Sequence, residues 1–352
     1  MKMRVLPFIL ILLLAFLTGM FWSSMFTNRG TSSIQLTQGV HLENKSPSYI
    51  LPSHRESVTL SDGVNEFHLN FSRLQEEFPY IQDYVCKLIL SPDIYYETSK
   101  SLILLAVKSR PASTDRRKAL RQTWAREWQL DGYVLRPVFL LGHTNVSGQM
   151  EIVKIESKEY GDILQWDLKE GYHSLPLKER CLLEYIVHNL PKVAFIYKGD
   201  DDMYVNPPVL VNLIETFGSN PWVLHGNVMV REGVTRSGRN IISKYLYPEP
   251  FYPNFLSGGG FIFSGPSARI LYEISLKLPV FPLDDVYFGF LTLAANLTLR
   301  HDNRFHVFGL RFEPCKYQKA LVIHRMTPDQ LVEQWNKVQN ANCSNSSNPT
   351  PK

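Results

Sequence analysis

The chain has 352 residues, of which 44% are hydrophobic and 20% are charged, so it is long and apolar enough for one large domain or two modest ones. This composition excludes a disordered chain. The formal net charge of +4 is small for this length and the basic residues are dispersed, so the charge balance indicates no nucleic-acid partner.

The amino-terminal segment has the character of a membrane anchor. Residues 5–26 follow Lys2 and Arg4 and carry no charge, and roughly 20 apolar residues suffice to cross a bilayer. The alternative is a cleaved signal peptide, but the run exceeds the usual core of roughly 7 to 15 residues and no small-residue cleavage site follows. We therefore expect a single transmembrane helix at residues 5–26, with the tail at residues 1–4 in the cytosol and the remainder in a lumen.

The domain boundaries follow from composition. Residues 27–80 are polar and weakly periodic, which predicts a stem. The expected lumenal domain covers residues 81–343, and residues 344–352 form a polar tail. Motifs of the form N-x-[ST], which are glycosylated in a lumen, agree with this topology. They occur at Asn44, where the following Pro47 disfavours modification, and at the expected acceptors Asn70, Asn145, Asn296, Asn342 and Asn345.

The four cysteines would lie in an oxidising compartment, where three complete pairings of four cysteines are open. We favour a disulfide between Cys315 and Cys343. Cys181 falls on the apolar face of an expected helix, and a buried free thiol is at least as good an interpretation for it.

From residue 100, apolar runs of strand length alternate with helical patterns. Strands are expected in "SLILLAVKS", "YVLRPVFLLG", "KVAFIYKG" and "GGFIFSG". Helices are expected in "STDRRKALRQTWARE", "SLPLKERCLLEYIVHNLP" and "TPDQLVEQW", where Thr327 would be the N-cap and Pro328 the first helical residue. This alternation predicts an α/β domain with a largely parallel sheet.

Three adjacent aspartates, Asp200, Asp201 and Asp202, follow the expected strand "KVAFIYKG". In α/β sheets, ligands bind beyond the carboxyl ends of the strands. Carboxylates held this close repel one another by about 4 kcal/mol per pair near a protein surface, so a divalent cation is the natural partner, and Mg²⁺ or Mn²⁺ would also bind substrate phosphates. The alternative is a solvated acidic turn or helix cap.

Three further stretches carry candidate site residues. Arg117 and Arg121 lie four residues apart beside Arg116, a pattern that suits phosphate oxygens or a solvated basic face. The "SGGGF" stretch permits close approach of a ligand or a tight structural turn. In "PLDDVYF", one aspartate suits a general base and the other a helix cap. The glycines are Gly258, Gly259 and Gly260, and the acidic pair is Asp284 and Asp285.

Taken together, these motifs resemble one family. The sequences "RRKALRQTW", "ESKEYGDILQWD", "LPLKE", "YKGDDDMYVN", "YPNFLSGGGFIFSG" and "PLDDVYFGF" stand in the order and approximate spacing of the inverting β-1,3-glycosyltransferases of the Golgi. The resemblance covers residues 100 to about 340. It is closest to the β-1,3-N-acetylglucosaminyltransferase branch, because "DDVY" replaces the Glu-Asp-Val that is common in galactosyltransferases.

The resemblance implies a GT-A fold, with a Rossmann-like nucleotide-sugar domain and a mixed sheet, in a type II Golgi membrane protein. It implies Asp202 and His324 as ligands of Mn²⁺ or Mg²⁺, and Asp285 as the base that deprotonates the acceptor. The donor would be UDP-GlcNAc or UDP-Gal, and the acceptor a glycan on a glycoprotein or glycolipid. The residues expected to bind the donor are Asp200, Asp201, Lys178, Arg116, Arg117 and Arg121, and those expected near the sugars are Gly258, Gly259, Gly260, Asp284 and Tyr252.

Several alternatives stay open at this point. Tyr252 suits stacking on a sugar and packing in the core equally, whereas Trp124 is expected to pack in the core. The segment 167–180 departs from the family pattern around Lys178, which leaves the acceptor open. A β-1,3-galactosyltransferase is the rival enzyme, and a non-catalytic, calcium-dependent glycan-binding protein is the rival class. A homodimer is possible.

Overall fold

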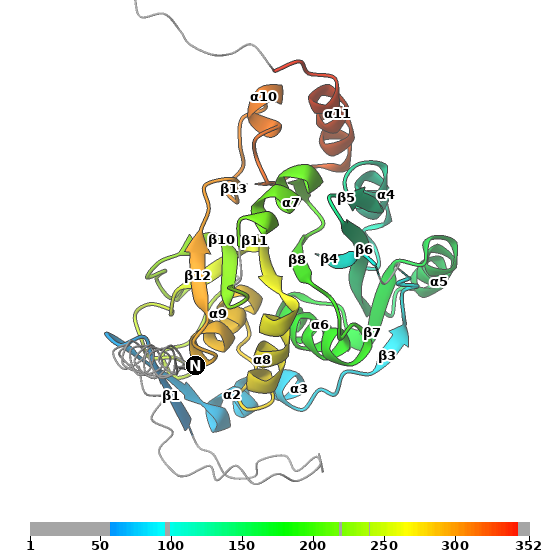
Figure 1. Cartoon of the computed structure of the whole chain (residues 1–352). Coiled ribbons are helices and arrows are strands. Elements are labelled where there is room, and N and C mark those ends of the chain that lie inside the picture. Colours follow the sequence, from blue (N-terminus) through cyan, green and yellow to red (C-terminus); the bar gives the residue numbers. More distant parts are fainter. Residues whose placement is uncertain (1–56, 96–98, 218–219, 239, 344–352) are drawn as a thin grey trace, which may run out of the picture.

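The computed structural model describes residues 57–95, 99–217, 220–238 and 240–343, and one large sheet lies at its centre (Figure 1). The strands of this sheet lie in the order β12-β10-β11-β8-β4-β6-β7-β3, and β5 pairs with β6. β8, β4, β6 and β7 run parallel to one another, whereas β11 is antiparallel to both β8 and β10, β3 is antiparallel to β7, and β5 is antiparallel to β6. The sheet is therefore mixed, and only its middle and the β10-β12 pair match the expected parallel arrangement.

The strands of the central sheet have the following bounds: β3 Leu88–Leu90, β4 Ser101–Lys108, β5 Trp128–Leu130, β6 Tyr133–His143, β7 Ile163–Lys169, β8 Phe195–Asp200, β10 Val223–Met229, β11 Phe255–Ser264 and β12 Thr298–His301. A smaller sheet has the order β13-β14-β9, with bounds Phe305–His306, Val322–His324 and Met203–Val205.

Strand β4 shows why both faces of the sheet are covered. Even-numbered residues from 102 to 106 pack in one hydrophobic core, and odd-numbered residues from 103 to 107 pack in another. Successive side chains of a strand point to opposite faces, so a run of apolar residues needs a layer on each side. Helices α6 (Leu175–Asn189), α8 (Gly265–Ser275) and α9 (Asp284–Ala294) contribute to the first core, and α4 (Thr114–Gln122), α7 (Pro207–Glu215) and α11 (Pro328–Gln339) to the second.

The helix ends follow the sequence signals. The side chain of Thr327 accepts from the backbone N–H of Gln330, whose side chain accepts from the N–H of Thr327, so α11 begins with a capping box. Leu331 and Trp335 of α11 are buried. Helix α6 ends at Asn189, just before Pro191. The remaining helices are α2 (Phe71–Glu77), α3 (Pro79–Gln82), α5 (Gln149–Tyr160), α10 (Pro314–Tyr317) and the 3₁₀ turn η1 (Tyr172–Ser174).

The prediction of a stem up to residue 80 is wrong for its described part. β1 (Ser57–Ser61) and β2 (Glu66–Asn70) form a hairpin, and α2 and α3 follow it. The inward side chains Val58, Leu60, Phe67 and Leu69 are at most 6% exposed and belong to the core beneath α9. Burying each such side chain stabilises the fold by about 1.5–3 kcal/mol. The apolar positions alternate over only five residues per strand, a signal that the polar composition of the segment obscured.

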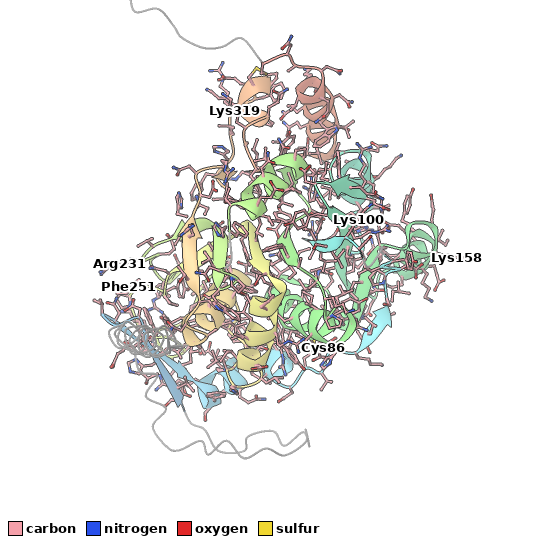
Figure 2. The ribbon with its side chains drawn as sticks, in the orientation of Figure 1. Cys86, Lys100, Lys158, Arg231, Phe251 and Lys319 are labelled. Carbon is pink, nitrogen blue, oxygen red and sulfur yellow. A yellow bond between two sulfur atoms is a disulfide. The ribbon has the colours of Figure 1, made fainter. Side chains whose placement is uncertain are left out.

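Two disulfides tie chain segments together. Cys315 pairs with Cys343, and Cys86 pairs with Cys181. Cys181 lies on the inward face of α6 as expected, but the free-thiol interpretation is wrong, because it pairs with Cys86 of the segment before β3, which is labelled in Figure 2. Each disulfide restricts the unfolded chain, and the 95-residue separation of the first pair makes its loop the longer one.

Among the residues described here, no helix has both the length and the apolar character needed to cross a bilayer. The expected anchor at residues 5–26, the rest of the predicted stem to residue 56 and the tail at residues 344–352 lie outside the described part of the chain.

Candidate active site

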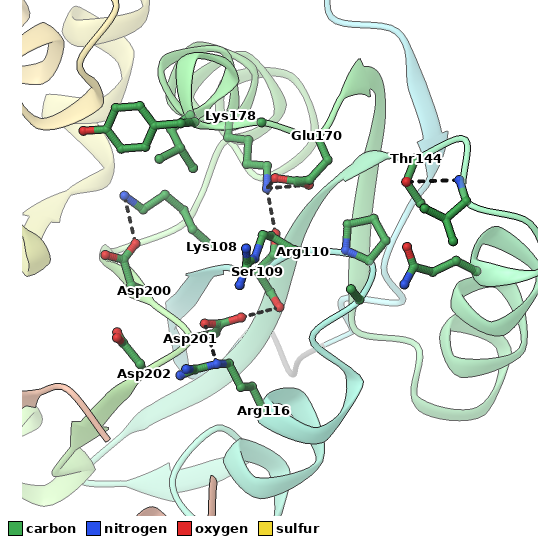
Figure 3. Close-up of a pocket in the computed structure, with 17 residues that line it drawn as sticks. Lys108, Ser109, Arg110, Arg116, Thr144, Glu170, Lys178, Asp200, Asp201 and Asp202 are labelled. Carbon is green, nitrogen blue, oxygen red and sulfur yellow. Dashed lines mark hydrogen bonds and ion pairs between the residues drawn. The ribbon is translucent and has the colours of Figure 1, made fainter. Parts of the chain in front are cut away.

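A cavity of about 640 Å³ opens at the carboxyl ends of β4 and β8 (Figure 3). These two strands are parallel, and Lys108 at the end of β4 lies opposite Asp200 at the end of β8. Residues at the ends of β4 and β8 and from the segments that follow β4, β6 and β7 line the cavity. They include Lys108, Ser109, Arg110, Arg116, Thr144, Val146, Gln149, Glu170, Tyr172, Lys178, Asp200, Asp201 and Asp202.

Asp200, Asp202 and His324 form a cluster, with one ligand-type atom from each lying within 4.8 Å of the others. The antiparallel pairing of β14 with β9 places His324 opposite Met203, next to Asp202. His324 Nδ1 donates to the carbonyl oxygen of Val307 at 2.8 Å, which leaves Nε2 facing Asp202 Oδ1 at 3.3 Å. A hydrogen bond of this kind fixes the orientation of an imidazole that presents its other nitrogen to a ligand.

The neighbouring carboxylate of Asp201 is oriented by protein contacts. Ser109 Oγ donates to Asp201 Oδ2 at 2.8 Å, and Arg116 Nε lies 3.8 Å from Oδ1 (Figure 3). Burial raises the pKa of Asp201, and the hydrogen bond from Ser109 and the charge of Arg116 oppose that shift. Asp201 therefore links the acidic turn to β4 and α4, while Asp200 and Asp202 face the histidine.

The second acidic pair stands in the first turn of α9 and differs from the first. Lys108 Nζ donates to Asp284 Oδ2 and lies 3.0 Å from Asp200 Oδ1, so one ammonium group joins the two acidic motifs. Burial alone would raise the pKa of Asp284, but the charges of Lys108 and Lys198 lower it to about 2. Asp284 is thus a fixed anion.

Asp285 keeps its carboxylate available. Its only described hydrogen-bond partner is the backbone N–H of Val286, which donates to Oδ1 at 2.9 Å. Burial and the adjacent charge of Asp284 raise the pKa of Asp285 to about 6. A carboxylate with a pKa near neutrality can accept a proton efficiently during a reaction.

The arginine pattern is only partly realised at the cavity. Arg116 reaches it, but Arg117 is fully buried and donates from Nε and Nη2 to Glu156 at 2.7 Å. Arg121 donates to Glu156 at 2.7 Å and to Asp162 at 2.8 Å. The expectation that Arg117 and Arg121 hold a donor phosphate is therefore wrong, because carboxylates of the chain already neutralise both guanidinium groups.

The glycines have separate surroundings. A Cβ atom at Gly258 would lie 3.6 Å from Asp285 Cβ and 3.8 Å from Lys108 Nζ, so this glycine borders the second acidic pair. A Cβ atom at Gly259 would meet Met203 at 3.0 Å, and one at Gly260, where φ is +140°, would meet Tyr197 at 2.7 Å. Gly259 and Gly260 thus permit close packing inside the protein, and only Gly258 lies beside the candidate site.

Tyr252 belongs to the core and not to a sugar-binding surface. Its ring stacks on Tyr247 at a centroid distance of 5.6 Å and contacts Phe281, and the residue is 4% exposed. The expectation of sugar stacking by Tyr252 is wrong, since the packing alternative holds. Trp124 is buried as expected and donates to the carbonyl oxygen of Met203.

Lys178 lines the cavity, but contacts with the protein occupy its ammonium group. Lys178 Nζ donates to Ser109 O at 2.6 Å and to the two carboxylate oxygens of Glu170 at 2.8 and 2.9 Å. Burial lowers the pKa of Lys178, and Glu170 opposes that shift. The Lys178–Glu170 pair thus holds the segment after β7 against the end of β4.

Sequence reasoning missed several residues of the site. Lys108 is the most important of these, and Ser109, Arg110, Glu170, Glu179 and Lys198 accompany it. A signal was present, because Lys108 ends the apolar run of β4 and Lys198 interrupts that of β8, and a charged side chain at such a position needs a partner.

The glycosylation candidates differ in accessibility. Asn145, Asn296 and Asn342 are exposed, whereas Asn70 is half-buried and its side chain caps α2 by accepting from the N–H of Arg73. Asn345 lies outside the described residues.

A sequence model of the family described as galactosyltransferase matches residues 115–303, more than half of the chain and both acidic motifs. The chain belongs to the galactosyltransferase family. Curated relatives of this chain are named either as N-acetylglucosaminyltransferases or as galactosyltransferases. It is 33% identical to N-acetyllactosaminide beta-1,3-N-acetylglucosaminyltransferase 4 of Homo sapiens, over 71% of this chain and 68% of that protein.

Two further relatives extend the comparison. The chain is 34% identical to UDP-GlcNAc:betaGal beta-1,3-N-acetylglucosaminyltransferase 7 of Rattus norvegicus, over 69% of this chain and 66% of that protein. It is 32% identical to Beta-1,3-galactosyltransferase 5 of Mus musculus, over 72% of this chain and 84% of that protein. The match thus spans about two thirds of the two N-acetylglucosaminyltransferases. The family is one of β-1,3-glycosyltransferases, and its members differ in the sugar that their names specify.

Proposed function

We propose that the protein is an inverting β-1,3-N-acetylglucosaminyltransferase with a GT-A fold, which transfers N-acetylglucosamine from UDP-GlcNAc to a galactose-terminated glycan on a glycoprotein or glycolipid. The observation that carries this proposal is the pairing of two acidic motifs at one edge of the sheet. Asp200 and Asp202 face a histidine in an open cavity, while Asp284 is neutralised by Lys108 and leaves Asp285 free as a base.

The first motif fits a hard divalent cation. Two carboxylates and an imidazole nitrogen are a donor set that Mn²⁺ accepts, and carboxylates also suit Mg²⁺. Asp202 Oδ1 is buried and lacks a well-aligned hydrogen-bond donor among the described residues, as expected of an oxygen reserved for a ligand. Asp202, His324 and Asp200 would hold the ion. When bound, such an ion would offset the charge of the donor diphosphate.

The chain's own residues supply the remaining steps. Asp285 takes the proton from the acceptor hydroxyl as that oxygen forms a bond to the anomeric carbon and the bond to UDP breaks, which inverts the configuration. General-base help of this kind is worth about 10²- to 10⁴-fold in rate. Arg116 and Arg110 line the cavity and are the arginines available to the diphosphate. Lys108 holds Asp284 as an anion, and the charge of Asp284 together with burial raises the pKa of Asp285, although Lys108 itself opposes that shift.

A β-1,3-galactosyltransferase using UDP-Gal is the second candidate. The similarity to a mouse protein of that name, over 84% of that protein's length, favours it. The "DDVY" sequence at the second acidic motif favours the N-acetylglucosaminyltransferase.

We also propose a type II Golgi membrane location, in which residues 5–26 anchor the chain. The described hairpin moves the start of the lumenal catalytic domain to residue 57 or before, so the stem would end within residues 27–56.

The test is a panel of UDP-sugars with the purified chain beginning at residue 27, a galactose-terminated acceptor and Mn²⁺. Transfer from UDP-GlcNAc, with the new linkage assigned by NMR as β-1,3, is the expected result, and chelation should abolish it. Transfer from UDP-Gal alone would establish the second candidate. Glycan binding without use of any donor would instead identify a non-catalytic member and overturn the proposal.

A further inference from the structure

A second layer of buried charge lies behind the two acidic motifs. Glu179 of α6 is 1% exposed and Lys198 of β8 is fully buried. Glu179 Oε1 lies 2.6 Å from Lys198 Nζ and 3.6 Å from Lys108 Nζ. The two lysine side chains therefore share one carboxylate, and Lys108 extends from it to Asp200 and Asp284.

The surroundings make this pair costly as a purely structural feature. Lys198 Nζ lies 4.6 Å from the ring centroid of Phe261 and 5.5 Å from that of Phe288, so apolar rings enclose the charge. Replacing a buried ion pair by well-packed apolar residues is often neutral or stabilising, so stability alone does not account for these charges. The distances point to a role in placing Lys108. Because Glu179 pairs more closely with Lys198 than with Lys108, the Lys108 ammonium group stays available to Asp284.

We propose that the buried Glu179–Lys198 pair is a positioning device that fixes the Lys108 ammonium group between Asp200 on the donor side and Asp284 on the helix that carries the base. This inference rests on the proposed function, which assigns Asp200 to the donor side of the site and Asp285 on α9 to the role of base. Neither member of the pair lines the cavity, so both act through Lys108 and not on a substrate.

Removal of Lys198 shows how the device works. In Lys198→Met, Glu179 loses its closer cation, and an unpaired carboxylate that is 1% exposed needs another. Lys108 is the nearest, so it moves toward Glu179 and away from Asp284 and Asp200. The first turn of α9 then loses its tether, and Asp285 is misplaced relative to the donor. Misplacement by about 1 Å can cost about 10²-fold in rate.

Removal of Glu179 has a related effect. In Glu179→Gln, two buried ammonium groups remain without the carboxylate between them, and their repulsion also shifts Lys108. Removal of both charges in Glu179→Gln/Lys198→Met leaves Lys108 with its carboxylate partners Asp284 and Asp200. The double variant should therefore be more active than either single variant, a pattern that a merely structural pair would not produce.

The experiment compares these three variants with wild type in steady-state kinetics with UDP-GlcNAc and Mn²⁺. We expect kcat to fall about 10- to 100-fold in each single variant, with UDP affinity by calorimetry within about threefold of wild type, and to recover at least about tenfold in the double variant. Asp162→Asn is the matched control. It also removes a buried carboxylate from an ion pair, with Arg121, but neither Asp162 nor Arg121 lines the cavity, and the variant should lower the melting temperature while leaving kcat unchanged.

Crystal structures of wild type and Lys198→Met supply a readout independent of transfer. The expected result is a Lys108 ammonium group bonded to Glu179 and no longer to Asp284. Wild-type kcat in folded Lys198→Met, a double variant no more active than the singles, or an unmoved Lys108 would each overturn the inference. Failure of wild type to use any UDP-sugar would overturn the proposed function instead, and the crystallographic comparison would still decide the positioning role.

Discussion

The two acidic motifs contain the same residue type at the same edge of the sheet, yet their surroundings differ. In the first motif, Asp200 and Asp202 stand in the open cavity, and His324 is the third member of their cluster. In the second, Asp284 is 9% exposed and is bonded to Lys108, and Lys198 adds further positive charge. A protein cation thus holds Asp284 directly, whereas Asp202 in the cavity faces the imidazole of His324.

This difference explains how neighbouring carboxylates can do different work. A cluster short of positive charge gains most from binding a cation, so the first motif suits a metal and a diphosphate. A carboxylate next to a permanently charged neighbour resists ionisation, so its pKa rises toward the range useful to a base. The two motifs share Lys108, and a change in one motif should therefore leave a measurable trace in the other.

Exchanging single carboxylates for amides gives the largest predicted contrast. We expect Asp285→Asn to lower kcat by about 10²- to 10⁴-fold while UDP binding in Mn²⁺ is retained, because only the proton acceptor is lost. Asp202→Asn should abolish both transfer and Mn²⁺-dependent UDP binding, because a charged ligand atom is lost. Calorimetry and a radiolabelled transfer assay on both variants check the contrast. Loss of UDP binding in Asp285→Asn, with the fold intact, would contradict the division of roles.

The sequence predicted the strand ends that carry this contrast more reliably than it predicted partners. The apolar run of β8 predicted that Asp200 and Asp202 lie at a strand end, whereas His324 was assigned from the family resemblance, and the pairing of β14 with β9 brings it beside Asp202. Partners of Arg117 and Arg121 could not be foreseen, since Glu156 lies 39 residues after Arg117 and on a different helix. A pattern of basic residues predicts which face of a helix they share, but it does not predict which acidic side chain of another element will pair with them.

The stem, the free thiol and the missed lysine have the same cause, because each depends on a contact between segments that are far apart in the sequence. The hairpin at residues 57–70 is short and polar in composition, so only its packing against α9 shows that it belongs to the domain. Cys181 was placed correctly on the inward face of α6, but its partner Cys86 lies 95 residues earlier in a segment without periodicity. Lys108 was missed because its three carboxylate neighbours come from β8, α6 and α9, which only the tertiary structure brings together.

The two aspartates of the second motif also differ in their response to pH, because the pKa of Asp284 is lowered and that of Asp285 is raised. With the pKa of Asp285 at about 6, its carboxyl group is protonated at lower pH, so kcat at saturating donor should fall about tenfold per pH unit below that value. Asp284, with a pKa of about 2, stays ionised throughout this range. A pH profile of kcat between about pH 4.5 and 8 checks the prediction. A flat profile would exclude Asp285 as the base.

The pH dependence of stability follows from the same two shifts. The pKa of Asp285 is raised by folding, so its contribution to stability is present at low pH and is lost as pH rises through about 6. The lowered pKa of Asp284 contributes stability above its ordinary pKa of 3.8, and that contribution is lost as pH falls toward about 2. Asp285→Asn should therefore melt at a higher temperature than wild type at pH 7.5, and Asp284→Asn at a lower one.

The smallest predicted effect is that of Tyr252→Phe, which tests whether Tyr252 belongs to the core or to a sugar-binding surface. Tyr252 is buried, and its hydroxyl has no hydrogen-bond partner among the described residues. Removing an unsatisfied buried hydroxyl is nearly neutral or stabilising, so Tyr252→Phe should change the free energy of unfolding by less than about 1 kcal/mol. Because the ring stacks on Tyr247 and not on a ligand, the KM for a galactose-terminated acceptor should stay at the wild-type value. Tyr252→Ala, by contrast, should destabilise the fold by about 3–5 kcal/mol through the cavity that it leaves. Denaturant unfolding and acceptor titration of both variants distinguish the cases. A raised acceptor KM in the stable Tyr252→Phe variant would return this side chain to the acceptor site.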